Sequence, residues 1–427
     1  MNSPLQRLQT KKGVLFVNTV MLYLLTFSEY LLSFIIVPVE THILGDEGYG
    51  VLGTAAAIAV YFQIVIDFGF MVSATEDVSK NRTDCKTLGT ILSSVTIIKL
   101  ALSLLSAGLL FLLCRLVPAW RTHTGFFMLY LLSTVISRLL PDFMYRGLEK
   151  MTAITVRAVL VKAFFAGMIF LFLHKPEDVY IVPLMNIIGN SVSLIFIYLH
   201  LNKKLHIRFE KASVKEILAM LKKSLYFFFS RAASSIYTTS NTVILSIVAG
   251  DSITGIYKAS DNLSTMAKNA MSPISDSLYP YMLKNKDFKL VRKMLLIFMP
   301  IITAGCVLVY FIAPPVCLWF FGEGFEETGY VLRCLIPGIF VILPSYILGF
   351  PTLSPMGKAK HVNLSTLLGS GIYLLGLAVL FLLHSVTIYS LALLLSFTEI
   401  IIMLYRLIVV LKNKKEFLAQ PSAEEPI

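Results

Sequence analysis

The stretch LGDEGYGVLGTA, residues 44–55, returns in altered form as AGDSITGIYKAS at residues 249–260. The glycine and aspartate at 45–46 align with those at 250–251, at an offset of 205 residues. Two more pairs recur at offsets of 204 and 210: KNR at 80–82 with KNK at 284–286, and Gly147 and Lys150 with Gly357 and Lys360. Three echoes at nearly one offset favour an internal duplication over chance recurrence of Gly-Asp turns.

The composition is that of a protein that lies in lipid. Of 427 residues, 56% are hydrophobic and 15% charged, and the mean hydropathy is +0.77. A soluble chain of this length cannot bury so much apolar surface, so we expect an all-α polytopic membrane protein. The five cysteines form no C-x-x-C pair, and we expect no disulfide framework, metal site or cofactor.

The chain contains enough apolar runs of about 20 residues for twelve membrane helices. We place them at 14–38, 51–72, 88–113, 125–145, 152–173, 179–200, 224–248, 253–279, 293–318, 328–350, 362–383 and 386–411. With both termini in the cytoplasm, the inner segments hold 26 Lys and Arg and the outer loops hold 3. This split satisfies the positive-inside rule. It also explains the net charge of +12 without a nucleic-acid partner.

The longest loop divides the spans into six and six. We predict an N-terminal six-helix bundle at 1–200, a basic cytoplasmic linker at 201–223, a C-terminal six-helix bundle at 224–411 and a disordered cytoplasmic tail at 412–427. The linker is amphipathic and is expected on the membrane surface. An even number of spans per half makes the repeats parallel, and the binding site of such a protein lies between its halves.

Ionisable residues inside spans are costly, at about 2.5 to 3.5 kcal/mol each on insertion scales. They are Glu29, Asp67, Lys99, Arg138, Lys162, Arg231, Lys258, Asp261, Lys268, Asp276, Arg333, Glu399 and Arg406. The eight bases exceed the five acids, which suits an anionic solute.

The span 253–279 carries the longest polar stripe. Lys258, Asp261, Asn262, Thr265, Lys268, Asn269, Ser272 and Asp276 follow helical spacing and share one face. A wet stripe along a membrane helix predicts a water-filled cavity. The alternative is internal neutralisation of Lys258 by Asp261, one turn away.

Other buried charges divide into cavity and non-cavity candidates. Arg231 shares a face with Thr238, and snorkelling to the interface is its alternative role. Lys99 and Lys162 lie near mid-span and are stronger cavity candidates, whereas snorkelling is favoured for Arg406.

Glu29, Asp67 and Asp261 are candidate proton or sodium sites, with structural ion pairs as the alternative. Glu399 is equally ambiguous.

Four motifs resemble the Wzx-type polysaccharide flippases of the multidrug/oligosaccharidyl-lipid/polysaccharide exporter superfamily. They are HILGDEGYG (42–50), DFGFMVSATEDVSKNR (67–82), YRGLEKM (145–151) and GIYKASDNL with PISDSLYPYM (255–282). The resemblance covers essentially the whole chain.

The resemblance implies two six-helix bundles around a cavity in the bacterial cytoplasmic membrane. It implies transfer of an undecaprenyl-diphosphate-linked oligosaccharide between leaflets by alternating access. Arg231, Lys258 and Lys268 carry over as cationic substrate contacts, and Glu29 carries over as the ion-coupling site. Expected partners are the lipid-linked sugar, membrane lipid, protons or sodium ions, and the polysaccharide polymerase machinery.

Two rival functions remain open at this point. One is a multidrug or cation antiporter of the same fold, which the cation-bearing helices disfavour. The other is a membrane enzyme of polysaccharide assembly, which the short outer loops and the absence of a D-x-D motif disfavour.

Overall fold

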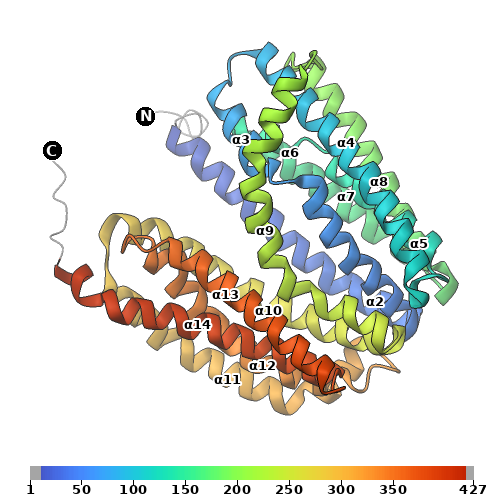
Figure 1. Ribbon diagram of the computed structural model, residues 1–427, viewed down its shortest axis with the longest axis vertical. Coiled ribbons are helices and arrows are strands. Elements are labelled where there is room, and N and C mark those ends of the chain that lie inside the picture. The colour runs from blue at the N-terminus through green and yellow to red at the C-terminus, as the bar shows by residue number, and fades with distance from the viewer. Residues whose placement is uncertain (1–10, 420–427) are drawn as a thin grey trace, which may run out of the picture. The chain divides into compact units, whose positions relative to one another are not determined.

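The computed structural model describes residues 11–419 (Figure 1), apart from the side chains at 11–20, 22–26, 29–30, 230, 233–234, 236 and 415–419. Within that range every regular element is a helix. The chain folds as two compact units, residues 1–232 and 233–427. The boundary between them falls within α9 (Val214–Val248).

Unit 1 is a bundle in which α2 packs against α4, α5 and α7, while α8 packs against α5 and α7. Its elements are α2 (Lys11–Asp67), α3 (Phe70–Lys80), α4 (Cys85–Leu116), η1 (Pro118–Trp120), α5 (Thr124–Arg138), α6 (Asp142–Gly147), α7 (Met151–Phe172), η2 (Pro176–Tyr180) and α8 (Ile181–Lys203). A core containing Phe70, Leu92, Met144 and Tyr145 joins α3, α4 and α6. Gly147 lies against Val78 so closely that a Cβ there would collide with it. This core holds one end of the bundle together beside Asp67.

Unit 2 is built around α12, which packs against α10, α11 and α14. Its elements are α10 (Asp251–Asn285), α11 (Phe288–Phe321), α12 (Thr328–Ile347), the π-helical η3 (Leu348–Leu353), α13 (Lys360–Leu382) and α14 (Ile388–Ala419). Leu278 and Met282 of α10 are buried against Leu343 and Ile347 of α12. Figure 1 shows α10, α12, α13 and α14 running beside one another.

The repeated turns of the sequence have a common backbone. Gly45 has φ 69° and ψ −178°, and Gly250 has φ 87° and ψ 177°. This region of backbone space is almost exclusive to glycine. The second echo agrees, because an aspartate caps the helix after each copy: Asp84 for α4 and Asp287 for α11.

The third echo differs in backbone conformation between its two copies. Gly147 is helical within α6, whereas Gly357 has φ 72°. The first echo therefore keeps its backbone, and the second keeps only its capping aspartate, because the chain leaves α3 at Asn81 with φ −120° but leaves α10 at Lys286 with φ 49°.

The all-α, multi-pass prediction is confirmed. In the part of the chain that the structure describes, nine helices are long and apolar enough to cross a membrane. The count of twelve stays a prediction. Both α9 and α10 have 35 residues, ample length for a span, but they carry the polar stripes and are not among the nine.

Three segments expected as loops or tail are partly helical. Residues 73–80 belong to α3, residues 214–223 open α9, and α14 continues through Ala419. In the basic segment, Ile217 and Leu221 pack on the core of unit 1, while Val214 and Leu218 are exposed. Its apolar face is thus shared between protein and surroundings. The prediction of disorder is wrong for residues 412–419, and residues 420–427 lie outside the described part.

Candidate functional site

A break between α2 and α3 places the first candidate carboxylate. Asp67 is the last residue of α2, and Phe68 and Gly69 turn the chain with φ of 41° and 81°. A Cβ at Gly69 would collide with the backbone of Ser224 and Phe228 on α9, so glycine permits this close approach. A carboxylate at a helix C-terminus is unfavourable unless cations offset it.

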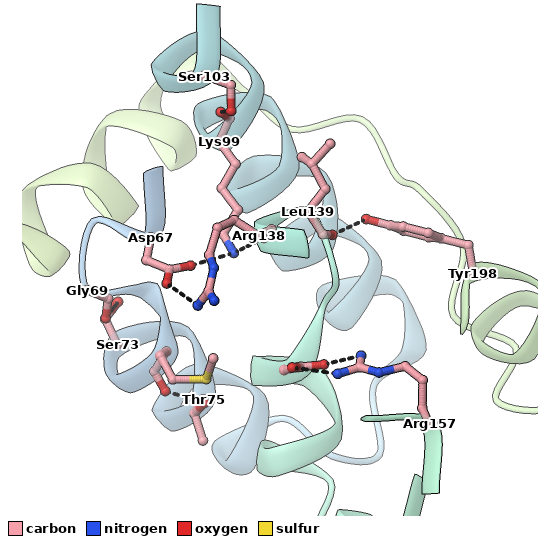
Figure 2. Close-up of polar contacts among 12 residues, drawn as sticks. Asp67, Gly69, Ser73, Thr75, Lys99, Ser103, Arg138, Leu139, Arg157 and Tyr198 are labelled. Carbon is pink, nitrogen blue, oxygen red and sulfur yellow. Dashed lines mark hydrogen bonds and ion pairs between the residues drawn. The ribbon is translucent and has the colours of Figure 1, made fainter. Parts of the chain in front are cut away.

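Two cations meet Asp67 inside unit 1 (Figure 2). Lys99 Nζ lies 3.1 Å from Asp67 Oδ1, and Arg138 Nη1 lies 3.2 Å from Asp67 Oδ2. Lys99 also donates to the Arg138 carbonyl at 2.5 Å, one of the carbonyls left without a helical partner at the end of α5. The side chains of Asp67 and Lys99 are only 4% and 5% exposed. We call these three residues the Asp67 cluster.

The Asp67 cluster has an excess of positive charge. One carboxylate faces two cations, and the charge of Arg231, an exposed residue of α9, also acts on Asp67. The buried Arg138 Nε has no hydrogen-bond partner among the described residues. Lys162 lies half-buried on α7, a helix that contributes nothing to the cluster. The side chain of Glu29, the predicted coupling acid, lies outside the described residues.

Unit 2 contains a second group of charges, which borders a cavity of about 230 Å³. Lys268 Nζ of α10 lies 3.3 Å from Glu399 Oε1 of α14. Asp261 lies two turns before Lys268 on α10, and its Oδ2 forms an ion pair with Lys258 Nζ at 3.5 Å. We call the lining of this cavity the Lys268 pocket: Tyr237, Thr238, Asp261, Thr265, Lys268, Asn269, Ile342, Ser345, Tyr346, Leu395, Glu399, Ile402 and Arg406.

The Lys268 pocket brings together seven of the residues singled out from sequence, among them Thr265, Glu399 and Arg406. Thr238 comes from α9, and Asp261, Lys268 and Asn269 come from α10. Lys258 joins them through Asp261. Asn262 is half-buried on α10, and its side chain is not part of the lining.

The polar stripe of α10 continues into a second cavity of about 440 Å³. Ser272, Asp276 and Tyr279 line it, and Tyr346 and Arg406 border both cavities. From Asp261 to Tyr279 the helix rises about 27 Å. The stripe therefore borders two cavities over most of a bilayer thickness, and the water that its pattern predicts in them stays a prediction.

The structure overturns the snorkelling expectation for Arg406. This residue is 9% exposed, and its Nη1 donates to the Ser345 carbonyl and hydroxyl at 2.9 and 3.0 Å. Its Nε donates to Ser365 Oγ at 2.9 Å. Burial with fixed hydrogen bonds makes it a pocket residue. Glu399, left ambiguous by sequence, is the partner of Lys268.

The pocket also uses side chains that carried no sequence signal. Tyr237, Ser345 and Tyr346 are ordinary residues of membrane helices, and nothing in their spacing marks them as lining a cavity.

The sequence comparisons with known proteins agree with one another. A family model described as "Polysaccharide biosynthesis protein" matches residues 15–286. A Shigella dysenteriae protein named "Putative O-antigen transporter" is 26% identical over 399 residues, covering 91% of this chain and 98% of that protein. An Escherichia coli K12 protein of the same name is 23% identical over 362 residues, covering 83% of this chain and 87% of that protein.

Solved structures share the fold. The lipid II flippase MurJ, in an inward closed conformation, matches with a TM-score of 0.70 at 13% identity, covering 94% of this chain and 90% of MurJ. An inward-facing multidrug resistance transporter of the MATE family matches with a TM-score of 0.64 at 15% identity, covering 91% and 94%. The chain therefore has the transporter fold of these two proteins.

Proposed function

Because this chain belongs to the polysaccharide biosynthesis protein family, we propose that it is a flippase for undecaprenyl-diphosphate-linked oligosaccharide repeat units. Relatives named as O-antigen transporters and the MurJ-like fold support a transporter of lipid-linked polysaccharide in the cytoplasmic membrane. The substrate's diphosphate is its invariant, doubly charged part. Recognition of that group is the task assigned to the cations.

The Lys268 pocket is the observation that carries the proposal. Charged side chains between membrane helices are costly and mark substrate or ion pathways. Here two cations, Lys268 and Arg406, and two acids, Asp261 and Glu399, line a cavity instead of forming a closed cluster. An anionic group that enters can replace Glu399 as the partner of Lys268, through charge-assisted hydrogen bonds to its oxygens.

The proposed mechanism is alternating access of the two units, with the polyprenyl tail left in lipid. Moving negative charge outward is downhill in an inside-negative potential, by about 2.3 kcal/mol per charge per 100 mV. Coupling to protons or sodium ions at Glu29, Asp67 or Asp261 would add to this. Two cations already hold Asp67, which favours Asp261 or Glu29 for that role.

The test is lipid analysis in a strain lacking the gene. We expect lipid-linked repeat units to accumulate and surface polysaccharide to fall. Wild type should reverse both changes, and the Arg231→Ala, Lys268→Ala double variant should not. A matched double variant at exposed lysines, Lys86→Ala with Lys175→Ala, should complement fully at equal expression. An unchanged amount of lipid-linked repeat units in the deletion strain would contradict the proposal.

A cation antiporter is the second candidate, because Asp261 and Glu399 place two carboxylates in the Lys268 pocket. Drug susceptibility of the same deletion strain separates the two functions. We expect no change in susceptibility. A several-fold increase, with normal surface polysaccharide, would favour the antiporter.

A further inference from the structure

A long apolar groove runs between α7 and α8 on unit 1, with a volume of about 1230 Å³. On α7, Val156, Leu160 and Phe164 line it at intervals of four residues. On α8, Val192 and Phe196 do the same. Leu160 is 65% exposed and Phe196 is 68% exposed, so this surface faces the surrounding medium, which is lipid in a membrane protein.

The length of the groove matches one leaflet. Its lining on α7 extends from Thr152 to Phe164, a rise of about 18 Å. Half of a hydrocarbon core is about 15 Å. A chain lying in the groove would therefore reach from the headgroup level to the bilayer centre and no further.

One end of the groove is polar and basic. Lys150 is exposed and lines it immediately before α7 begins. His200 lines it near the end of α8, where its Nδ1 lies 2.7 Å from the Tyr145 hydroxyl. Lys150 and Lys204 both lie close enough to His200 for their charges to act on its ring. The charge pattern of the sequence assigns this end to the cytoplasm.

The acids at this end are already neutralised. Glu149 accepts from Arg82 at 2.6 Å. Asp142 accepts both terminal nitrogens of Arg157, at 2.6 and 3.0 Å (Figure 2 shows Arg157). The charges of Lys150 and Lys204 therefore remain in excess and favour an anionic headgroup at this position.

From these features we propose that the α7–α8 groove is a binding site for one anionic phospholipid of the cytoplasmic leaflet. The acyl chains lie on the apolar lining, and the phosphate lies between Lys150 and His200, beside Lys204. A phospholipid fits better than the polyprenyl substrate, because the groove ends after the depth of one leaflet. This site is separate from the proposed transport pathway and does not depend on it.

The experiment is native mass spectrometry of the purified full-length protein, titrated with phosphatidylglycerol, phosphatidylethanolamine or undecaprenyl phosphate. We expect one phosphatidylglycerol to stay bound preferentially. Each lysine near an anionic headgroup is worth about fivefold in affinity, so Lys150→Ala with Lys204→Ala should weaken phosphatidylglycerol binding roughly 25-fold. The single variant Lys86→Ala, at an exposed lysine of α4, should leave it unchanged.

A second pair of variants tests the groove itself. Val156→Trp fills the groove and should abolish retention, whereas Leu104→Trp, at a 78% exposed position on α4, should not. Thermal unfolding of both variants should match wild type, since both positions are exposed. Equal retention of the two phospholipids, or equal loss in both tryptophan variants, would mean annular lipid only. Displacement of phosphatidylglycerol by equimolar undecaprenyl phosphate would identify the substrate lipid as the occupant. Either result overturns the proposal.

Discussion

The Asp67 cluster of unit 1 and the Lys268 pocket of unit 2 both place opposite charges between membrane helices, but they differ in access. Asp67 is shared by two cations, and its side chain is 4% exposed. Lys268 is 15% exposed, pairs with Glu399 and borders a cavity that can hold several waters. The buried ion pairs of the Asp67 cluster suit a structural role, in which they hold helices together. An open pair beside a polar cavity suits a site where a ligand exchanges with a side chain.

The largest effect on stability should come from removing the charge of Asp67. We expect Asp67→Asn to lower the free energy of unfolding by about 3–5 kcal/mol, because it leaves the buried charge of Lys99 without its counterion and also removes the partner of the half-buried Arg138. Thermal unfolding in detergent measures this loss, with Glu177→Gln, at an exposed acid of η2, as the matched control. Adding Lys99→Met should restore part of the stability. An Asp67→Asn protein as stable as the control would show that the Asp67 cluster does not stabilise the fold.

The repeated glycines test whether the two units share the same backbone turn, although their buried charges differ. Gly45→Ala and Gly250→Ala should each cost about 1–3 kcal/mol, because both positions need a backbone region that alanine avoids. No atom lies within 4 Å of the added Cβ at either site, so the cost is conformational. Equal losses in thermal unfolding are expected. A neutral variant at one site would mean that the turns are not equivalent.

The pocket pair should respond in transport more than in stability. We expect Glu399→Gln to cost about 1–2 kcal/mol at most, since Lys268 can turn to water in the cavity. Complementation of the deletion strain should fall several-fold, because Lys268 loses the partner that positions it. If Glu399→Gln destabilises as much as Asp67→Asn, the distinction between the two regions fails.

The smallest effect should come from the matched helix caps. Asp287 accepts from the backbone N–H groups of Lys289 and Leu290 at 2.9 and 3.1 Å, and Asp287→Ala should cost about 1 kcal/mol. Asp84 caps α4 in the same way, so Asp84→Ala should lower the unfolding temperature too. Loss at one cap alone would weaken the equivalence of the two loops.

The cap at Asp84 also has a pH dependence with a definite sign. Hydrogen bonds from the Thr87 hydroxyl and backbone lower the pKa of Asp84. A lowered pKa means that the contribution is present above the ordinary value of about 3.9 and is lost as the pH falls through the lower folded value. The difference between wild type and Asp84→Asn in thermal unfolding should therefore shrink below about pH 4. A constant difference at every pH would contradict this.

The sequence by itself determined the lipid environment, the helical class and the inventory of costly charges. Each follows from local composition, because a bilayer rejects charge and demands long apolar helices wherever they occur. The turn at Gly45 and its copy at Gly250 were also readable, since a short glycine-aspartate motif sets its own backbone.

Only the tertiary structure decided which charge meets which. Asp67 lies 32 residues from Lys99 and 71 from Arg138, and Lys268 lies 131 from Glu399. Such partners depend on how each helix is rotated and packed, and periodicity along one helix does not encode that. The same reason explains Arg406, whose position near a helix end indicated snorkelling. Its burial comes from hydroxyls and carbonyls on α12 and α13, which the sequence of α14 alone cannot reveal.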